Sequence, residues 1–113
     1  MMHTMNLNPA PFAMIKSGKK TVELRLYDEK RQQIKMGDQI LFTNTATEET
    51  LTVTVVKLHI FENFTQLYES LPLLQCGYTE ADINTAHPSD MEQYYSAEKQ
   101  QKYGVVGIEL CLP

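Results

Sequence analysis

Three ionisable side chains in the segment 18–25 are spaced so that they could share one site: Lys20, Glu23 and Arg25. Glu23 and Arg25 lie two positions apart, so in an extended strand both side chains project from the same face. A neighbouring arginine keeps a carboxylate ionised and oriented. Lys20, crowded by Lys19 in a partly covered cleft, could give up a proton and act as a base. The alternative is an exposed Glu23–Arg25 ion pair with solvated lysines, which would contribute little to stability.

Charge is distributed unevenly along the chain. The net charge is −4, which argues against a strongly basic nucleic-acid binder. The segment 16–35, however, holds seven basic and three acidic residues, whereas the segment after Lys35 holds three basic and eleven acidic residues. A molecule polarised in this way can offer an anion a local positive field and repel it elsewhere. The alternative is a lysine-rich face that is simply solvated.

Other side chains could help this segment to hold a nucleic-acid component. Arg25 and Arg31 could grip a phosphate or stack on a base. Tyr27 directly follows the segment, and Tyr94 and Tyr95 lie further along the chain. A tyrosine that faces the cleft could stack on a base. The alternative is that one of Tyr94 and Tyr95 packs in the core while the other is exposed.

Signatures of other chemistries are absent from the sequence. It contains no G-x-x-x-x-G-K-[ST] phosphate loop, no G-x-G-x-x-G dinucleotide motif, no H-E-x-x-H zinc motif and no G-x-S-x-G nucleophile elbow. His3, His59 and His87 are scattered without ligand spacing, and Cys76 and Cys111 do not form a Cys-x-x-Cys pair. We therefore expect no metal site and no cofactor.

The segment 18–25 is predicted to lie where a helix gives way to a strand. Asn8 and Pro9 mark the start of the helix, with Asn8 as N-cap and Pro9 at the first helical position. Gly18 ends the helix at the position that favours a left-handed residue. Apolar and polar residues alternate over Thr21–Tyr27, which predicts a strand with one buried face and one polar face.

Four more strands are predicted, at Met2–Leu7, Gln39–Asn44, Thr50–Ile60 and Val105–Leu112, the last three from alternating apolar residues. The third of these changes phase, because its apolar residues occupy odd positions up to Val55 and even positions from Val56. A slip of one residue indicates a bulge that redirects the chain, as in a sheet that curls into a barrel. A strand covered on both faces would give a similar pattern.

The region before the last strand is expected to be helical. Phe64–Leu71 is predicted to form a short helix, and capping-box patterns at Thr79–Asp82 and Ser89–Glu92 predict helices near Glu80–Ala86 and Asp90–Tyr103. A charged loop or helical turn is expected at 28–34. Because strands flank a helical insert, the predicted fold class is α+β, with the last strand closing onto the early ones.

Length and composition predict the setting of the protein. The 113 residues, 42% of them hydrophobic, fit a single domain over 1–113 with one core. No apolar run approaches the roughly 18 residues of a membrane-spanning helix, and the first residues lack the basic and apolar regions of a secretory signal. Two cysteines in different segments are expected to be reduced thiols. We therefore expect a soluble cytoplasmic protein.

A family resemblance rests on the same residues. Gly18-x-Lys20-x-x-Glu23-x-Arg25 matches the G-x-K-x-x-E-x-R signature of ASCH domains, a branch of the PUA-like superfamily. Lys35–Phe42 resembles the Gly-Asp strand of that family, and Tyr103–Leu110 resembles its closing strand. The resemblance, which points to the small bacterial single-domain type, spans nearly the whole chain. It implies a curled β-barrel of about five to six strands, with an N-terminal helix and a helical insert before the last strand. It also implies RNA or nucleotide binding in a cleft lined by the motif.

One position departs from a catalytic branch of the family. Some small ASCH proteins resemble acetylcytidine amidohydrolases, in which the motif lysine activates a threonine two positions before the arginine. Here Lys20 is retained, but Glu23 occupies the threonine position, and Thr21 comes directly after the lysine. A carboxylate cannot take the role of the hydroxyl in acyl transfer. Glu23 could instead act as a general base or orient Lys20.

Three hypotheses for the function remain open. The first is a domain that binds RNA or a nucleotide or nucleoside in a basic cleft, where Lys20, Arg25 and Arg31 contact phosphate and Glu23 contacts a base edge or orders the cations. The second is a metal-independent hydrolase acting on a modified nucleoside or on RNA, with Lys20 and Glu23 as catalytic residues. The third is a protein-interaction module, which the acidic remainder of the chain favours. The predicted ligand-binding residues are Gly18, Lys19, Lys20, Thr21, Glu23, Arg25, Arg31 and Tyr95.

Overall fold

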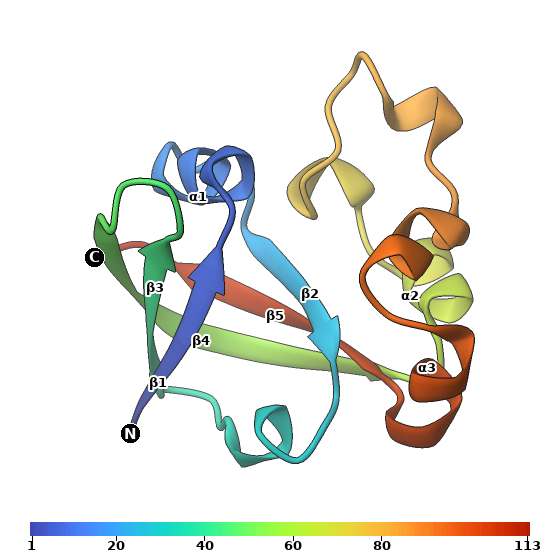
Figure 1. The fold of residues 1–113 in the computed structure, drawn as a ribbon, viewed down its shortest axis with the longest axis horizontal. Helices are drawn as coiled ribbons and strands as arrows, with labels where there is room; N and C mark the ends of the chain where they lie inside the picture. The colour runs from blue at the N-terminus through green and yellow to red at the C-terminus, as the bar shows by residue number, and fades with distance from the viewer.

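Five strands form one sheet in the order β1-β3-β4-β5-β2 (Figure 1). The computed structural model describes all residues, 1–113. The strands are β1 (Met2–Leu7), β2 (Val22–Leu26), β3 (Gln39–Asn44), β4 (Thr50–Phe61) and β5 (Val105–Cys111). The helices are α1 (Pro9–Lys16), α2 (Phe64–Ser70) and α3 (Ala97–Tyr103). Only β1 and β3 pair in parallel. The order leaves β1 and β2 as the two edges of the sheet.

The long strand β4 contains the bulge that the phase change predicted. Val55 pairs with Leu110, and Lys57 pairs with Glu109, so Val56 has no partner on β5. An extra residue of this kind bends the strand and increases its twist. The sheet accordingly curls into a half-barrel, which confirms the predicted α+β class and curled sheet with an N-terminal helix and a helical insert.

Two hydrophobic clusters hold the sheet and its helices together. The larger joins α1 to the sheet and consists of Met5, Leu7, Phe12, Ile15, Ile34, Ile40, Phe42, Val53, Val55, Val106, Ile108 and Leu110. The smaller joins β2 to the region before β5 and consists of Val22, Leu24, Leu26, Phe64, Leu67, Cys76 and Val105. Strand β5 contributes to both clusters because Val105 and Val106 point to opposite faces. The sheet is therefore covered on both sides where β5 and β2 meet.

The turn that follows α1 forms as predicted. Asn8 is the N-cap of the helix and Pro9 its first residue, although the Asn8 side chain makes no capping hydrogen bond. Gly18 has a φ of 82°, in the left-handed region, and its N–H donates to the carbonyl of Ile15. A glycine adopts this conformation without the strain that a Cβ would add. The chain thus turns sharply from α1 toward β2.

The insert, defined as residues 62–104, differs from the prediction in its helices. Phe64–Leu71 is helical as predicted, and the helix expected over Asp90–Tyr103 is confirmed over its second half as α3, whereas the α-helix expected near Glu80–Ala86 is wrong. The chain instead forms short 3₁₀ turns at Ile83–Thr85 and Pro88–Gln93, followed by α3.

The capping box of the second turn uses His87 and Asp90, two residues before the predicted pair. Pro88 takes the first helical position, which fixes the start of the turn there. Ser96 then caps a new helix by accepting from the N–H of Lys99, so the long helix is divided. None of the helices has the length and apolar character that crossing a membrane requires.

Candidate functional site

Strand β2 places Glu23 between two cations, in an arrangement that we call the triad (Lys20, Glu23 and Arg25). Lys20 Nζ lies 2.8 Å from Glu23 Oε1. Arg25 donates from Nε to Glu23 Oε2 at 2.9 Å, and its Nη2 is also 2.9 Å from that oxygen. The side chains are largely buried, with 10%, 5% and 14% exposure for Lys20, Glu23 and Arg25. The face of β2 that was predicted to be polar is therefore enclosed, and the interpretation of an exposed ion pair with a solvated Lys20 is wrong.

Burial and charge act against each other on the Glu23 carboxylate. Burial by itself raises the pKa of Glu23, because a charged group loses hydration. The charges of Lys20 and Arg25, together with their hydrogen bonds, lower it further than burial raises it, so the pKa lies below its ordinary value. Glu23 is consequently a fixed anion. With two cations around one carboxylate, the triad has a local charge of +1.

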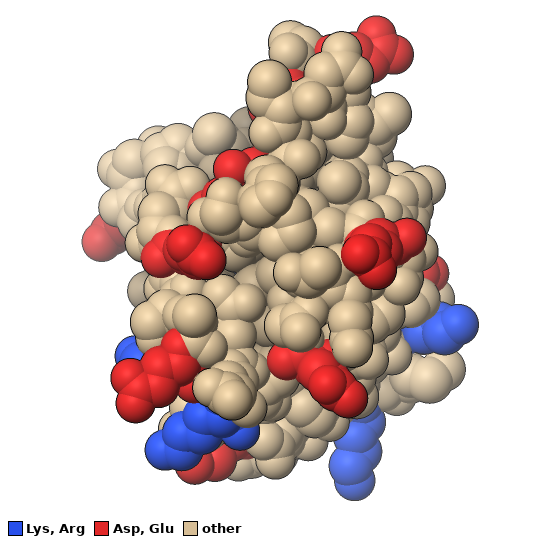
Figure 2. Space-filling model, turned by 90° about the vertical axis from the view of Figure 1, so that its right-hand side faces the viewer, with Lys and Arg blue, Asp and Glu red and all other residues tan.

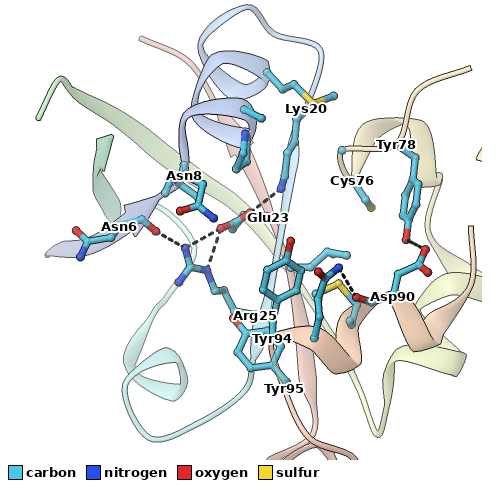
Figure 3. A pocket seen from close by; sticks show the side chains of 18 of the residues that line it. Asn6, Asn8, Lys20, Glu23, Arg25, Cys76, Tyr78, Asp90, Tyr94 and Tyr95 are labelled. Atoms are coloured by element: carbon cyan, nitrogen blue, oxygen red, sulfur yellow. Dashed lines mark hydrogen bonds and ion pairs between the residues drawn. The ribbon is translucent and has the colours of Figure 1, made fainter. Parts of the chain in front are cut away.

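Backbone contacts set the position of Lys20 at the entrance to β2. Its N–H donates to the carbonyl of Met14 in α1, and the next N–H, of Thr21, donates to the carbonyl of Gln75 in the insert. The Lys20 side chain then packs against Gly77: a Cβ added there would lie 3.3 Å from Lys20 Cδ and 3.5 Å from Nζ. Lys20 is thus held between α1 and the insert, with its ammonium group directed at Glu23 (Figure 3).

Arg25 connects the two edges of the half-barrel. Its Nη2 donates to the carbonyl of Asn6 at 2.8 Å, and Asn6 belongs to β1. Edge strands leave backbone groups without ladder partners, and here a side chain from the opposite edge supplies one. Figure 3 shows the continuous set of contacts from Asn6 through Arg25 and Glu23 to Lys20.

The triad forms one wall of a cavity of about 540 Å³. The residues lining it from β1, α1 and their connection include Asn6, Leu7, Asn8, Ala10, Pro11 and Met14. The residues lining it from the insert include Tyr68, Cys76, Gly77, Tyr78, Asp82, Asp90, Met91, Gln93, Tyr94 and Tyr95. The cavity therefore lies between the insert and the seam of the half-barrel, which is the place where the edge strands β1 and β2 approach each other.

The insert wall contains a chain of hydrogen bonds that sequence reasoning missed. Tyr78 Oη donates to Asp90 Oδ2 at 2.6 Å, and Tyr68 Oη lies 2.7 Å from Tyr78 Oη. The three residues are 10 to 22 positions apart in irregular sequence, so no spacing rule brings them together. The one local signal was the capping-box pattern, and it pointed to Ser89 and Glu92 rather than to Asp90.

The two adjacent tyrosines of the insert both line the cavity. Tyr95 is partly buried and stacks on Phe64, with ring centroids 6.1 Å apart and an interplanar angle of 19°. Burial raises the pKa of Tyr95, which therefore stays a neutral phenol at neutral pH. Tyr94 is 61% exposed. One ring of the pair is thus packed and the other is exposed, as the alternative proposed. Both residues nevertheless line the cavity.

The structure brings four of the predicted ligand-binding residues to the cavity and leaves four outside it. Lys20, Glu23, Arg25 and Tyr95 line the cavity, whereas Gly18, Lys19, Thr21 and Arg31 do not. Lys19 is exposed to solvent. Thr21 Oγ1 lies 3.4 Å from Gln75 Oε1, and Arg31 pairs with Asp28 at 3.0 Å. Gly18 contributes through the turn that it allows. No group of three or more His, Cys, Asp or Glu side chains is arranged to hold a metal ion.

Comparison with known proteins identifies the family. The ASCH domain model matches residues 5–113. The crystal structure of the hypothetical protein PH0355 is similar to the chain at 34% identity and a TM-score of 0.83, with 100% of both chains covered. The solution NMR structure of protein PF0455 from Pyrococcus furiosus is similar at 34% identity and a TM-score of 0.74, covering 97% of this chain and 96% of that one.

A more distant structure shares the fold. The crystal structure of ASCH from Zymomonas mobilis has 16% identity and a TM-score of 0.65, and the match covers 97% of this chain and 66% of that one. No curated protein matches the chain significantly. The family model matches nearly the whole sequence, and the triad lies where the motif predicted it. The chain therefore belongs to the ASCH domain family.

Proposed function

We propose that the cavity binds a single nucleoside or a ligand of that size, with the free N–H groups of Lys20 and Arg25 as its polar contacts. The observation that carries the proposal is the buried triad in the wall of a cavity of about 540 Å³. Small-molecule sites are commonly about 300–1,000 Å³, mostly apolar or aromatic, with a few fixed polar groups. The cavity has this character.

Each cation of the triad keeps donors for a ligand. An ammonium group has three N–H donors, and Lys20 uses one of them on Glu23. Arg25 uses Nε and Nη2 on Glu23 and Asn6, which leaves its Nη1. Glu23 contacts both cations with its two oxygens, so we assign it the role of ordering them rather than of contacting a base edge. Tyr94 and Tyr95 supply rings on which a base could stack.

Charge favours a small ligand over a long RNA strand. The cavity is lined by two cations, Lys20 and Arg25, and by three carboxylates, Glu23, Asp82 and Asp90. The insert as a whole has seven acidic and two basic residues. Figure 2 shows this side of the molecule, where acidic groups are spread over the surface and Lys and Arg lie toward its lower part. A polyanion crossing this face would be repelled.

Calorimetric titration with nucleosides, nucleotides and short oligoribonucleotides at two salt concentrations tests the proposal. We expect a nucleoside to bind with little salt dependence, because few phosphate contacts are made. Lys20→Met should weaken binding by roughly 10- to 100-fold, the value of a hydrogen bond to a charged group. Lys19→Met is the matched control, since Lys19 is exposed and lies outside the cavity. Thermal melting confirms that each variant is folded.

Two results would contradict the proposal. The first is no nucleoside binding at millimolar concentration together with steeply salt-dependent binding of oligoribonucleotides. The second is an equal effect of Lys20→Met and Lys19→Met, because the cavity would then not be the site.

Hydrolysis of an acylated nucleoside is the weaker proposal. Hydrolysis through an acyl-enzyme needs a hydroxyl or thiol nucleophile beside Lys20, and hydrolysis by water needs a free general base. Thr21 lies outside the cavity, with its hydroxyl toward Gln75, and Glu23 is held by both cations. Cys76 does line the cavity, but burial raises the pKa of its thiol to about 11, although the nearby Lys20 lowers it, so little thiolate is present at neutral pH.

A further inference from the structure

We infer that the insert wall of the cavity selects nucleobases that carry an exocyclic amino group, and that Asp90 is the residue that makes this selection. The inference rests on the proposed function, since it concerns which nucleosides the same cavity accepts. It depends on the direction of the hydrogen bonds from Tyr68 to Tyr78 and from Tyr78 to Asp90. Figure 3 shows the second of these, between Tyr78 and Asp90.

The direction of these hydrogen bonds is fixed by the number of protons. A tyrosine hydroxyl has one proton to donate. Tyr78 donates its proton to Asp90 Oδ2 at 2.6 Å. The contact of 2.7 Å between Tyr68 Oη and Tyr78 Oη must therefore be made by the proton of Tyr68. Both tyrosine protons are therefore used in hydrogen bonds that run toward Asp90, and neither hydroxyl can donate to a ligand.

The protonation states support the same direction. The hydrogen bond from Tyr78 lowers the pKa of Asp90, and a second hydrogen bond, from the His87 N–H to Oδ2 at 3.1 Å, lowers it further. Burial is the main cause that raises the pKa of Tyr78, and the hydrogen bond to the Asp90 carboxylate raises this pKa further. Burial likewise raises the pKa of Tyr68. At neutral pH Asp90 is thus a carboxylate, and Tyr68 and Tyr78 are protonated phenols.

The Tyr68–Tyr78–Asp90 part of this wall therefore offers only acceptors to a ligand. Asp90 Oδ2 is occupied by Tyr78 and His87, but Oδ1 has no hydrogen-bond partner within the protein. The oxygen of Tyr68 also receives no donor. The triad on the other wall offers donors from Lys20 and Arg25. A ligand that satisfies both walls must bring an acceptor to the triad and an N–H donor to Asp90.

Nucleobases divide into two classes by the exocyclic group that would meet Asp90. Cytosine and adenine carry an exocyclic amino group, which is a donor, whereas uracil and hypoxanthine carry a carbonyl oxygen at the same position. Carboxylates accept from the amino group of cytosine in protein–nucleic acid complexes. A carbonyl oxygen placed against Asp90 would leave two acceptors facing each other without a proton between them. We therefore expect amino bases to be preferred by roughly tenfold or more.

The inference can be tested on the wild-type protein by titration with two matched pairs of nucleosides. These pairs are cytidine with uridine, and adenosine with inosine. Tighter binding of the amino member by about tenfold in at least one pair is the expected result. Equal affinity within both pairs overturns the inference and leaves the proposed function standing. Failure of all four nucleosides to bind overturns the proposed function, and the inference with it.

Substitution of Asp90 assigns the selection to this residue. Asp90→Asn keeps an oxygen for the N–H of His87 and gives the cavity an amide donor, so the preference should shrink or reverse. Glu92→Gln is the matched control, because it removes the same charge from the same turn but outside the cavity. A similar loss of preference in both variants would show a general effect of charge and overturn the role of Asp90. Should Asp90→Asn not fold, the wild-type pairs still decide the inference.

Discussion

Glu23→Gln is the substitution that tests the triad most directly. Glutamine has nearly the same shape as glutamate, so the change removes the charge, keeps one oxygen as an acceptor and turns the other acceptor into an N–H donor. Lys20 and Arg25 then remain as two neighbouring cations without an anion, in a place where their side chains are only 10% and 14% exposed. The stability of the folded state should fall because these charges can neither pair nor hydrate fully.

The expected loss follows from the burial of the three side chains. Removing one partner from a buried ion pair costs about 3–5 kcal/mol. The remaining exposure of Lys20 and Arg25 allows some hydration, which places the free-energy loss near the lower end, at about 3 kcal/mol. With an unfolding entropy of about 2 cal/mol/K per residue, this loss lowers the Tm of a domain of this length by roughly 13 °C.

The loss should also depend on pH. The folded-state pKa of Glu23 lies below its ordinary value of 4.5. A carboxylate with a lowered pKa stabilises the fold at pH values above its unfolded pKa, and this contribution is lost as the pH falls through the folded-state pKa. The difference in unfolding free energy between wild type and Glu23→Gln should therefore be constant near neutral pH and shrink below pH 4.5.

Urea denaturation of wild type and variants at several pH values measures these quantities. Glu109→Gln on the adjacent strand is the matched control: Glu109 is 38% exposed and pairs with His59, so its loss should cost less than about 1 kcal/mol. Adding Lys20→Met to Glu23→Gln removes one of the two stranded cations, so the double variant should lose less stability than the two single losses added together. A loss below about 1 kcal/mol for Glu23→Gln, or strict additivity in the double variant, would refute the triad as a buried ion-pair network.

Two further predictions concern the backbone and the N-terminal strand. Gly104→Ala should lower the melting temperature more than Gly18→Ala does. Both glycines have a positive φ, but only at Gly104 would the added Cβ lie 2.9 Å from a backbone atom, the carbonyl oxygen of Phe61. Equal losses would contradict this prediction. The hydrogen bond with His3, followed by that from the Lys35 N–H, lowers the pKa of Asp38 to about 2, so its stabilising contribution should disappear between about pH 4 and pH 2. Asp38→Asn should flatten that part of the denaturation profile, and an unchanged slope would contradict the role of Asp38.

Local sequence patterns were sufficient for the sheet and for half of the site. The alternation of Thr21–Tyr27 and the glycine turn before it placed Lys20, Glu23 and Arg25 together, because strand geometry alone puts Glu23 and Arg25 on one face. The phase change at Val56 predicted the bulge for a similar reason. What alternation could not reveal is that the polar face of β2 is buried, since burial depends on Asn6 and on the insert, which are distant in sequence.

The middle of the insert, residues 72–96, was predicted poorly because its structure depends on tertiary contacts more than on propensity. Capping-box patterns are short, and the one at Ser89 competed with a better one at His87, where Pro88 fixes the backbone. The side chains of Tyr68, Tyr78 and Asp90 meet only after the chain has passed through several turns. The same segment packs Phe64, Leu67 and Cys76 against β2, and these contacts join residues that are far apart in the sequence.

The position of the cavity follows from the incomplete closure of the barrel. A half-barrel leaves unpaired backbone groups along β1 and β2, and a polar group without a partner is costly where the insert excludes water. Arg25 satisfies the carbonyl of Asn6, but it brings a charge into the seam, and that charge requires Glu23. Glu23 is then able to hold Lys20 as well, with donors of both cations left over. The groups that stabilise the seam are thus the same groups that can hold a ligand there, so substitutions that weaken ligand binding at Arg25 must also weaken the link between the two edges of the sheet.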